Sequence, residues 1–345
     1  RPMRWKSIKS STKPLTDNKK KVLVIPNIHS AGIELLAARP DVDYQILESQ
    51  APEAILNNVT DAHAIAVRTA LISSEVINAA PHLQVVARHG VGYDSVDVPT
   101  LTSRNIPLAI AIHSNAVSVA EHAMFMLLSL AKQGVYHHQE TRAGGFARLR
   151  GTGRGVEIAD KELLIIGFGR IGRQVAPRAR AFGMEVSVYD PYVDHEIIQR
   201  AECRVVTDLN LGVTQADAIT VHTPLNDETR GILGENQFAR MKPNTFVINT
   251  ARGGIVDETA LVAALRSNAI AGAGVDVFVG EPAPPTSNNP LFSFDNVIVS
   301  PHSAGVTQES LKRTAIEMIQ NVLNAFDDAI DPATVVNPEV LRVHA

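Results

Sequence analysis

The stretch that decides the fold is Leu163-Leu164-Ile165-Ile166-Gly167-Phe168-Gly169-Arg170-Ile171-Gly172, in which an apolar run leads into three glycines. Their spacing is G-x-G-x-x-G, and a helical stretch, Ile171–Phe182, follows. In this arrangement the first glycine permits a tight turn, the second lets the backbone approach a pyrophosphate, and the third lets the helix pack on the strand. We predict a strand followed by a dinucleotide-binding turn, with cofactor contacts from Gly167, Phe168, Gly169, Arg170, Ile171 and Gly172.

An acidic residue follows the next predicted strand, Glu185–Tyr189. Asp190 lies 18 residues after Gly172, where a carboxylate would accept hydrogen bonds from both hydroxyls of an adenosine ribose. Its charge would repel a 2′-phosphate, and the following Pro191 and Tyr192 supply no compensating arginine. The predicted cofactor is therefore NAD and not NADP, with Tyr189, Asp190 and Pro191 at its adenosine end.

Short β-branched runs alternate with helical stretches on both sides of this motif, a pattern typical of a parallel sheet covered by helices on both faces. On the C-terminal side a further helix is predicted at Glu258–Arg266. The predicted strands of this half are Leu163–Ile166, Glu185–Tyr189, Ala218–Val221, Phe246–Asn249, Gly272–Val277 and Val297–Ser300. Six such strands make a complete dinucleotide-binding fold.

The N-terminal half repeats the same architecture. Its predicted strands are Val22–Ile25, Tyr44–Leu47, Ala64–Val67, Val85–Ala87 and Leu108–Ile110, and its predicted helices are Ile33–Ala38, Pro52–Asn57, Ser73–Ala79 and Val98–Ser103. The fold class is therefore α/β, with two doubly wound parallel-sheet domains.

Three connecting segments complete the chain. A long apolar helix is predicted at about Val117–Ala131, with Ser118 and Glu121 in the spacing of a capping box. The glycine- and arginine-rich stretch Gly144–Gly155 predicts an irregular surface connection. A last helix is predicted at about Gln308–Phe326, and an extended tail at Ala333–Pro338.

Composition excludes several classes of protein. With 345 residues, 45% apolar and 20% charged, the chain can fold into two domains with real cores. The longest apolar run, Ala123–Ala131, is far shorter than the roughly 20 residues of a membrane span, so we expect no membrane partner. The single cysteine, Cys203, cannot form an internal disulfide or a metal-binding thiolate cluster, so a reduced, cytoplasmic location is expected.

Charge is distributed unevenly along the chain. Residues 1–21 carry eight Lys or Arg and one acidic residue, whereas the rest carries 24 basic and 35 acidic residues. An acidic body argues against nucleic-acid binding, which needs a basic face. Residues 1–20 are interpreted as a basic, disordered leader, with a cleaved targeting peptide as the alternative.

Polar residues follow several predicted strands of the second half, at the sheet edge where open α/β proteins bind ligands. Arg252, Glu281 and His302 are the reactive candidates among them. The cofactor-binding candidates at these strand ends are His222, Thr223, Pro224, Thr250, Ala251, Asp276 and Gly305.

With these motifs the sequence resembles the D-isomer-specific 2-hydroxyacid dehydrogenases, which include phosphoglycerate dehydrogenase and hydroxypyruvate/glyoxylate reductase. The resemblance extends from about Val22 to Pro338. It is carried by the glycine motif with Asp190 and by the blocks Asn115–His122, Asn249–Asp257, Gly274–Pro282 and Pro301-His302.

The resemblance implies a domain organisation. Residues 21–113 with 304–345 would form a discontinuous, flavodoxin-like catalytic domain, and residues 114–303 an inserted Rossmann NAD-binding domain. It also implies a homodimer formed through the NAD-binding domain around the long helix.

The resemblance also implies roles that the chemistry of 2-oxo acid reduction requires. His302 would be the proton donor in reduction and the base in oxidation, a task suited to a group that titrates near neutrality. Glu281 would hydrogen-bond the imidazole and favour its charged form. Arg252 would bind the substrate carboxylate with a planar fork that lysine lacks.

Substrate-binding candidates also occur in the first half. The loop Arg88–Asp94 resembles the family's segment whose backbone N–H groups receive the substrate carboxylate, which points to Gly90, Val91 and Gly92. Arg68 falls in a segment, Val67–Ala70, where phosphoglycerate dehydrogenases carry an arginine able to meet the substrate phosphate. Arg68, Gly90, Val91, Gly92, Arg252 and His302 are therefore the predicted substrate-binding residues.

We predict an NAD-dependent D-2-hydroxyacid dehydrogenase acting on a small 2-oxo or 2-hydroxy acid. A 3-phosphoglycerate dehydrogenase-like activity is favoured, and a hydroxypyruvate/glyoxylate reductase is the alternative. Glu281 argues against a formate dehydrogenase, whereas a phosphite dehydrogenase stays open. The alternative of another class is an NAD-sensing co-repressor-type scaffold.

Other reactive side chains are assigned no chemistry. The sequences His137-His138 and Asp194-His195-Glu196 contain residue types that bind metals, but no second cluster stands at ligand spacing. No metal is therefore expected. Cys203 has no flanking base motif and is predicted to be inert.

Overall fold

The computed structural model describes residues 19–281 and 283–341, which form two compact units. The first unit runs to Asn115 and resumes at Gln308, so it is discontinuous in sequence, and the second spans Ala116–Thr307. Residues 1–18, most of the predicted leader, and 342–345 lie outside the described residues. Lys20, which the leader was predicted to include, is instead the first residue of a strand.

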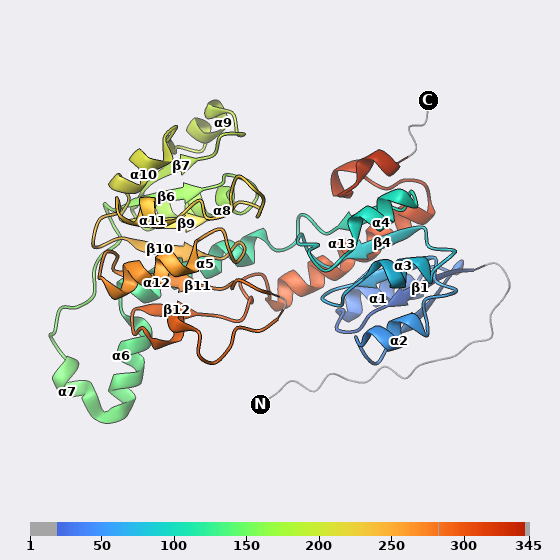
Figure 1. Ribbon diagram of the computed structural model, residues 1–345, viewed down its shortest axis with the longest axis horizontal. Coiled ribbons are helices and arrows are strands. Elements are labelled where there is room, and N and C mark those ends of the chain that lie inside the picture. Colours follow the sequence, from blue (N-terminus) through green and yellow to red (C-terminus); the bar gives the residue numbers. More distant parts are fainter. Residues whose placement is uncertain (1–18, 282, 342–345) are drawn as a thin grey trace. The chain divides into compact units, whose positions relative to one another are not determined.

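The first unit contains a five-stranded parallel sheet with the strand order β2-β1-β3-β4-β5 (Figure 1). This order is that of flavodoxin-like proteins. The strands are β1 (Lys20–Val24), β2 (Val42–Ile46), β3 (Ala64–Val67), β4 (Val85–Arg88) and β5 (Leu108–Ile110). The helices are α1 (Ser30–Ala37), α2 (Pro52–Leu56), α3 (Ser74–Asn78), α4 (Val98–Ser103) and α13 (Gln308–Phe326).

Both faces of this sheet are buried, which explains the continuous apolar runs of its strands. On β1, Val22 and Val24 pack with α1 and α13, whereas Leu23 belongs to the cluster that contains residues of α2, α3 and α4. Helices α1 and α13 cross closely, because a Cβ on Gly32 would lie 2.7 Å from the carbonyl oxygen of Ala315.

The second unit contains a seven-stranded parallel sheet with the order β12-β11-β10-β9-β6-β7-β8 (Figure 1). The strands are β6 (Glu162–Ile166), β7 (Glu185–Tyr189), β8 (Arg204–Val205), β9 (Ala218–Val221), β10 (Phe246–Asn249), β11 (Gly272–Val275) and β12 (Val297–Val299). The main helices are α5 (Ala116–Ala131), α8 (Gly172–Ala181), α9 (His195–Arg200), α10 (Leu209–Gln215), α11 (Glu235–Phe238) and α12 (Glu258–Arg266). Counted from β6, the strand order is that of a Rossmann fold with β12 added as a seventh strand.

The predicted α/β fold class with two doubly wound parallel sheets is confirmed. Strand β6 pairs with β7 on one side and with β9 on the other, so the chain changes direction across the sheet at β6. Ligands of open α/β sheets bind at such a switch point, outside the carboxyl ends of the strands.

Several local predictions differ from the structure. Helix α5 begins at Ala116, so Ser118 lies inside the helix and its hydroxyl bonds that of Thr307 at 3.0 Å instead of capping. The predicted loop Gly144–Gly155 is partly helical at its start. After α6 (Gly134–Glu140) the chain passes through Thr141–Gly145, where it kinks at Gly144 (φ +89°), and enters α7 (Phe146–Leu149).

The C-terminal tail is not extended over the whole of Ala333–Pro338, as predicted. It contains two 3₁₀ turns, Pro332–Thr334 and Pro338–Val340, and the residues between these turns pair with β5. There Val335 bridges Ala109, and the N–H of Val336 donates to the carbonyl of Leu108. Within the described part of the chain, no helix combines the length and apolar character that a membrane span requires.

Candidate active site

In the glycine turn after β6, two of the three glycines have no room for a side chain, whereas the third faces open space. Gly167 has φ +92°, and a Cβ there would lie 2.8 Å from the backbone of His222 at the end of β9. A Cβ on Gly172 would lie 2.3 Å from the carbonyl oxygen of Gly167. A Cβ on Gly169, in contrast, would meet nothing within 4 Å. The turn thus packs tightly against the sheet and leaves open space where a pyrophosphate would approach.

Asp190 lies directly over this turn. Its Oδ2 accepts a hydrogen bond of 2.7 Å from the N–H of Phe168, and its Oδ1 accepts one of 2.9 Å from the N–H of Tyr192. The Phe168 side chain is fully buried, so only the backbone of Phe168 faces the turn. Of its neighbours, Arg170 and Pro191 are exposed, and Ile171 and Tyr189 are half-buried.

The ends of the central strands carry buried polar atoms that have no hydrogen-bond partner among the described residues. These atoms are Nδ1 of His222, Oγ1 of Thr223 and Oγ1 of Thr250, which follow β9 and β10. Burial lowers the pKa of His222 to about 3, so its imidazole is neutral, and its Nε2 is 2.9 Å from the hydroxyl of Thr220. Unsatisfied buried polar atoms are costly, and a ligand rich in donors and acceptors would satisfy them. Together with the open side of Gly169, they fit a dinucleotide.

Three reactive side chains follow three adjacent strands, in the order Arg252 after β10, Glu281 after β11 and His302 after β12. The buried Asn249 shapes the first of these loops, because its Oδ1 accepts from the N–H of Ala251 and its Nδ2 donates to the carbonyl of Arg252. The resulting turn presents Arg252, whose guanidinium donates to the carbonyl of Ala251 at 2.7 Å. Pro224, at the end of β9, is exposed.

The loop that carries His302 is built around the fully buried Asp276. The Asp276 carboxylate accepts hydrogen bonds from the N–H groups of Ser303 and Ala304, at 2.8 and 2.9 Å, and from the hydroxyl of Ser300. The backbone carbonyl of Asp276 accepts from the N–H of His302, which has a φ of +50°. A positive φ is uncommon for histidine, so this conformation depends on the contacts around it. Both carboxylate oxygens are used within the chain, and the predicted contact of Asp276 with the cofactor stays a prediction, as does that of Gly305.

Glu281 and His302 form a hydrogen-bonded pair through Oε2 and Nδ1. Oε1 of Glu281 accepts a second bond of 2.8 Å, from the N–H of Phe278. Burial acts to raise the pKa of Glu281, but the hydrogen bonds from His302 and Phe278 and the charge of Arg252 outweigh it, and the pKa is lowered. An ionised Glu281 accepts the proton on Nδ1, which leaves Nε2 for another partner. The His302 side chain is 48% exposed, so that nitrogen can be reached.

The first unit gathers its own cationic side chains at the ends of β3 and β4. Arg68 is half-buried, burial lowers its pKa, and it makes no hydrogen bond or ion pair with any described residue. His89 is buried and neutral, because burial and then the charge of Arg68 lower its pKa to about 4. Gly90 has φ +111°, and a Cβ there would lie 2.8 Å from a guanidinium nitrogen of Arg88. Val91 is exposed and Gly92 is half-buried in the same loop.

The structure therefore brings the second-unit candidates together and gathers Arg68 with the Gly90 loop in the first unit. Sequence reasoning missed Asn249 and the structural role of Asp276, although an Asn two residues before a turn is a known turn-forming signal. No group of three or more His, Cys, Asp or Glu in residues 19–281 and 283–341 is arranged to hold a metal ion. Asp194 has a local role instead, because it caps α9 by accepting from the N–H of Glu196.

A Rossmann sheet with an open glycine turn, unsatisfied polar atoms beside it and an acid–base pair at neighbouring strand ends defines a dinucleotide-binding protein of the dehydrogenase class. The family model described as D-isomer specific 2-hydroxyacid dehydrogenase, NAD binding domain, matches residues 124–304. The chain belongs to the D-isomer specific 2-hydroxyacid dehydrogenase family.

Two of the relatives in this family have different names and different lengths. D-3-phosphoglycerate dehydrogenase of Methanocaldococcus jannaschii is 37% identical over 307 residues, which are 88% of this chain and 57% of the relative, so this chain spans about half the length of that protein. Glyoxylate reductase of Korarchaeum cryptofilum is 34% identical over 94% of this chain and 98% of the relative. The crystal structure of an NADPH-dependent glyoxylate/hydroxypyruvate reductase from Sinorhizobium meliloti, in complex with NADP and malonate, has a TM-score of 0.81 at 26% identity and covers 95% of this chain and 99% of its own.

Proposed function

We propose that this protein is an NAD-dependent D-2-hydroxyacid dehydrogenase, which catalyses reversible hydride transfer between NADH and a small 2-oxo acid. The observation that carries the proposal is the hydrogen-bonded Glu281–His302 pair, with Arg252 at the neighbouring strand end of a dinucleotide-binding unit. The roles of all these residues are part of the proposal.

The three side chains divide the chemistry of the carbonyl and carboxylate groups between them. The bound dinucleotide supplies the hydride. His302 donates a proton from Nε2 to the carbonyl oxygen as the alcohol forms, and it takes the proton back in the oxidative direction. Glu281 holds the imidazole through Nδ1 and fixes its orientation. Arg252 binds the substrate carboxylate by a two-pronged, charge-assisted contact.

The preferred substrate is proposed to be phosphorylated, as for a 3-phosphoglycerate dehydrogenase. Support comes from Arg68, a half-buried cation with no anionic partner in the described residues. It follows β3 beside the end of the neighbouring strand β4, where Arg88 and the buried, neutral His89 lie. Burying an uncompensated charge is costly, so such a group is suited to an anionic ligand. Hydroxypyruvate/glyoxylate reductase is the second candidate, because a glyoxylate reductase matches this chain over nearly its whole length.

Substrate preference is measured by NADH oxidation with hydroxypyruvate, glyoxylate, pyruvate, phenylpyruvate and 3-phosphohydroxypyruvate. We expect the highest kcat/KM with 3-phosphohydroxypyruvate. Arg68→Ala is expected to lower that value by about 10- to 100-fold, the effect of about 1.5–3 kcal/mol for a lost charge-assisted hydrogen bond. Its effect on hydroxypyruvate should stay below about threefold. An equal loss with both acids would return Arg68 to a structural role, and a preference for hydroxypyruvate or glyoxylate in the unmodified protein would favour the reductase.

Cofactor preference is assigned to Asp190. Asp190→Ala is expected to weaken NADH binding by about 10- to 100-fold, again from lost charge-assisted hydrogen bonds, and to weaken NADPH binding much less. Binding is measured by the fluorescence of each reduced cofactor. Because Asp190 also holds the N–H of Phe168, equal weakening of both cofactors would show that it acts through the glycine turn and does not read the ribose.

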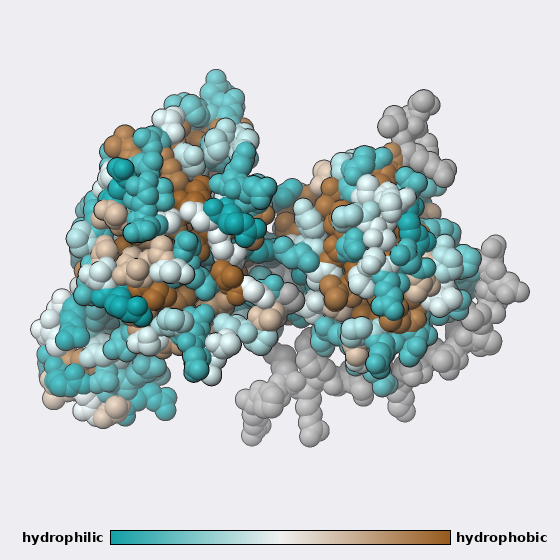
Figure 2. Space-filling model, in the orientation of Figure 1, coloured by the Kyte–Doolittle hydropathy of each residue, from teal (hydrophilic) through white to brown (hydrophobic). Residues whose placement is uncertain are grey.

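The same family resemblance supports a homodimer formed through the second unit. Helix α5 leaves Val117 and Phe125 exposed, and Phe146 is 62% exposed on α7 in the mostly hydrophilic segment at the lower left of Figure 2. Light scattering gives the molar mass that distinguishes one copy from two. A cytoplasmic location is proposed from the single, unpaired Cys203.

A further inference from the structure

The segment from Asp276 to Glu281 contains no regular strand or helix, yet it must hold Glu281 opposite His302. Its central peptide, between Phe278 and Val279, is fixed from two directions. On one side lies Gly253, where a Cβ would be 2.1 Å from the carbonyl oxygen of Phe278 and 2.5 Å from the nitrogen of Val279. The loop that carries Arg252 thus packs directly on the loop that carries Glu281, with no room for a side chain between them.

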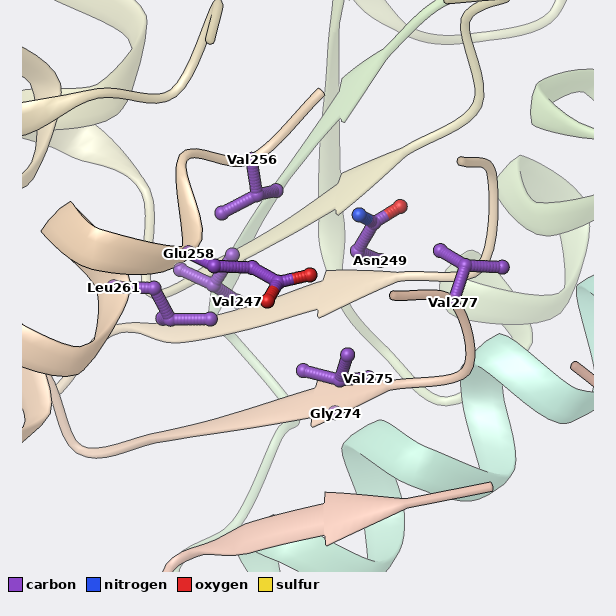
Figure 3. Close-up of a pocket in the computed structure, with 8 residues that line it drawn as sticks. All are labelled: Val247, Asn249, Val256, Glu258, Leu261, Gly274, Val275 and Val277. Atoms are coloured by element: carbon purple, nitrogen blue, oxygen red, sulfur yellow. The ribbon is translucent and has the colours of Figure 1, made fainter. Parts of the chain in front are cut away.

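The second contact comes from Glu258, the first residue of α12. Its Oε1 accepts a hydrogen bond of 2.5 Å from the N–H of Val279. Figure 3 shows the carboxylate of Glu258 reaching from the start of α12 over β10 and towards β11. The Glu258 carboxylate thus links α12 to Val279, two residues before Glu281 in the loop after β11.

The Glu258 side chain is half-buried. It lines a cavity of about 10 Å³ together with the polar Asn249 and the apolar side chains of Val247, Leu261 and Val275. Its partly desolvated charge is stabilised by its partners. The N–H of Val279 is one such partner, and the positive end of α12 is another. The helix start is capped separately by Asp257, whose Oδ1 accepts from the N–H of Ala260.

We propose that Glu258 is a positioning residue for the Glu281–His302 pair, which it holds in register through its hydrogen bond to Val279; this rests on the proposed function for its effect on catalysis. Loss of the bond frees the Phe278–Val279 peptide on one side. Glu281 then loses the fixed N–H of Phe278 and its alignment with His302.

The direct test is the titration of Glu281 itself, followed by carbon NMR of its carboxyl group in the full chain without substrate. In Glu258→Ala the pKa of Glu281 is expected to rise towards its ordinary value, because the hydrogen bonds from His302 and Phe278 that lower it are weakened. In Glu258→Gln it should stay low, since an amide oxygen can still accept from Val279. In Glu258→Asp, which keeps the charge but is shorter by one methylene, it should rise as in Glu258→Ala.

The kinetic test follows the same pattern. With the preferred 2-oxo acid, Glu258→Ala and Glu258→Asp are expected to lower kcat by about tenfold, with KM and NADH binding changed by less than about threefold. The effect is smaller than the roughly 10²–10⁴-fold contribution of a general acid–base group, because His302 is displaced and not removed. Glu258→Gln should recover kcat to within about threefold of the unmodified protein.

Asp257→Ala provides the matched control. It removes the cap of the same helix but leaves the bond to Val279, so it should lower the thermal unfolding midpoint with little change in kcat or in the titration of Glu281.

The proposal is overturned if Asp257→Ala reproduces the effects of Glu258→Ala, if Glu258→Gln is as impaired as Glu258→Ala, or if the titration of Glu281 does not move. If the unmodified protein reduces no 2-oxo acid, the proposed function fails, but the titration still decides the role of Glu258. If Glu258→Ala does not fold, the comparison of Glu258→Gln with Glu258→Asp provides the same test.

Discussion

Replacement of His302 by alanine is expected to lower kcat/KM for the 2-oxo acid by about 10²–10⁴-fold, the usual contribution of a general acid–base group. His302 is the side chain whose Nδ1 is held by Glu281 and whose exposed ring leaves Nε2 for the substrate. Without it, the alkoxide that forms on the carbonyl oxygen has no positioned proton. The loss is measured in steady-state kinetics at a saturating concentration of NADH.

NADH binding is the internal check on that result. It should change by less than about threefold in His302→Ala, because the glycine turn and the unsatisfied polar atoms that fit the dinucleotide lie after other strands. His195→Ala, at the start of α9, is the matched control and should leave kcat/KM unchanged. Retention of full activity in His302→Ala would remove this residue from the mechanism.

Replacement of Arg252 by alanine should cost about 10²–10³-fold in kcat/KM, most of it through KM for the 2-oxo acid. Truncation of one partner in a desolvated charge pair costs 2–5 kcal/mol or more, and each 1.4 kcal/mol corresponds to a factor of ten. Arg252→Lys keeps the charge but not the planar fork, so it should recover only part of the loss.

The controls for Arg252 separate substrate binding from cofactor binding and from folding. Arg266→Ala, at the end of α12, removes an exposed arginine of the same unit and should have no effect. NADH affinity should stay within about threefold in Arg252→Ala. A large loss of NADH affinity with an unchanged KM for the acid would show that Arg252 serves the cofactor instead.

Much of the architecture was predictable because its strands are buried on both faces. The predicted bounds hold for Ala64–Val67, Glu185–Tyr189 and Phe246–Asn249. Short stretches of β-branched and aromatic residues between turn signals favour strands. The glycine turn was equally predictable, because close backbone contacts exclude any side chain at Gly167 and Gly172.

The elements that sequence reasoning missed depend on contacts between distant segments. The two-residue strand β8 carries no apolar pattern of its own and exists by pairing with β7. Ser118 resembled a helix cap, but the helix continues to Ala116, and the Ser118 hydroxyl has a partner 189 positions away. Local patterns cannot reveal such partners.

In the site, too, contacts between distant segments could not be predicted from local sequence patterns. The residue types Arg252, Glu281 and His302 could be selected from strand ends and from the family resemblance, and the structure adds the hydrogen bond that joins two of them. The buried Asp276 beneath His302 and the bond from Glu258 to Val279 were not predictable, because each depends on the backbone of a loop from another strand.

The most direct test of the central claim is the product formed by the unmodified protein from NADH and 3-phosphohydroxypyruvate or hydroxypyruvate. Chiral chromatography of that product, with NADH consumption recorded in parallel, gives both stereochemistry and stoichiometry. We expect one D-2-hydroxy acid to form for each NADH oxidised. Formation of the L-isomer, or no NADH oxidation with any of the five 2-oxo acids, would contradict it.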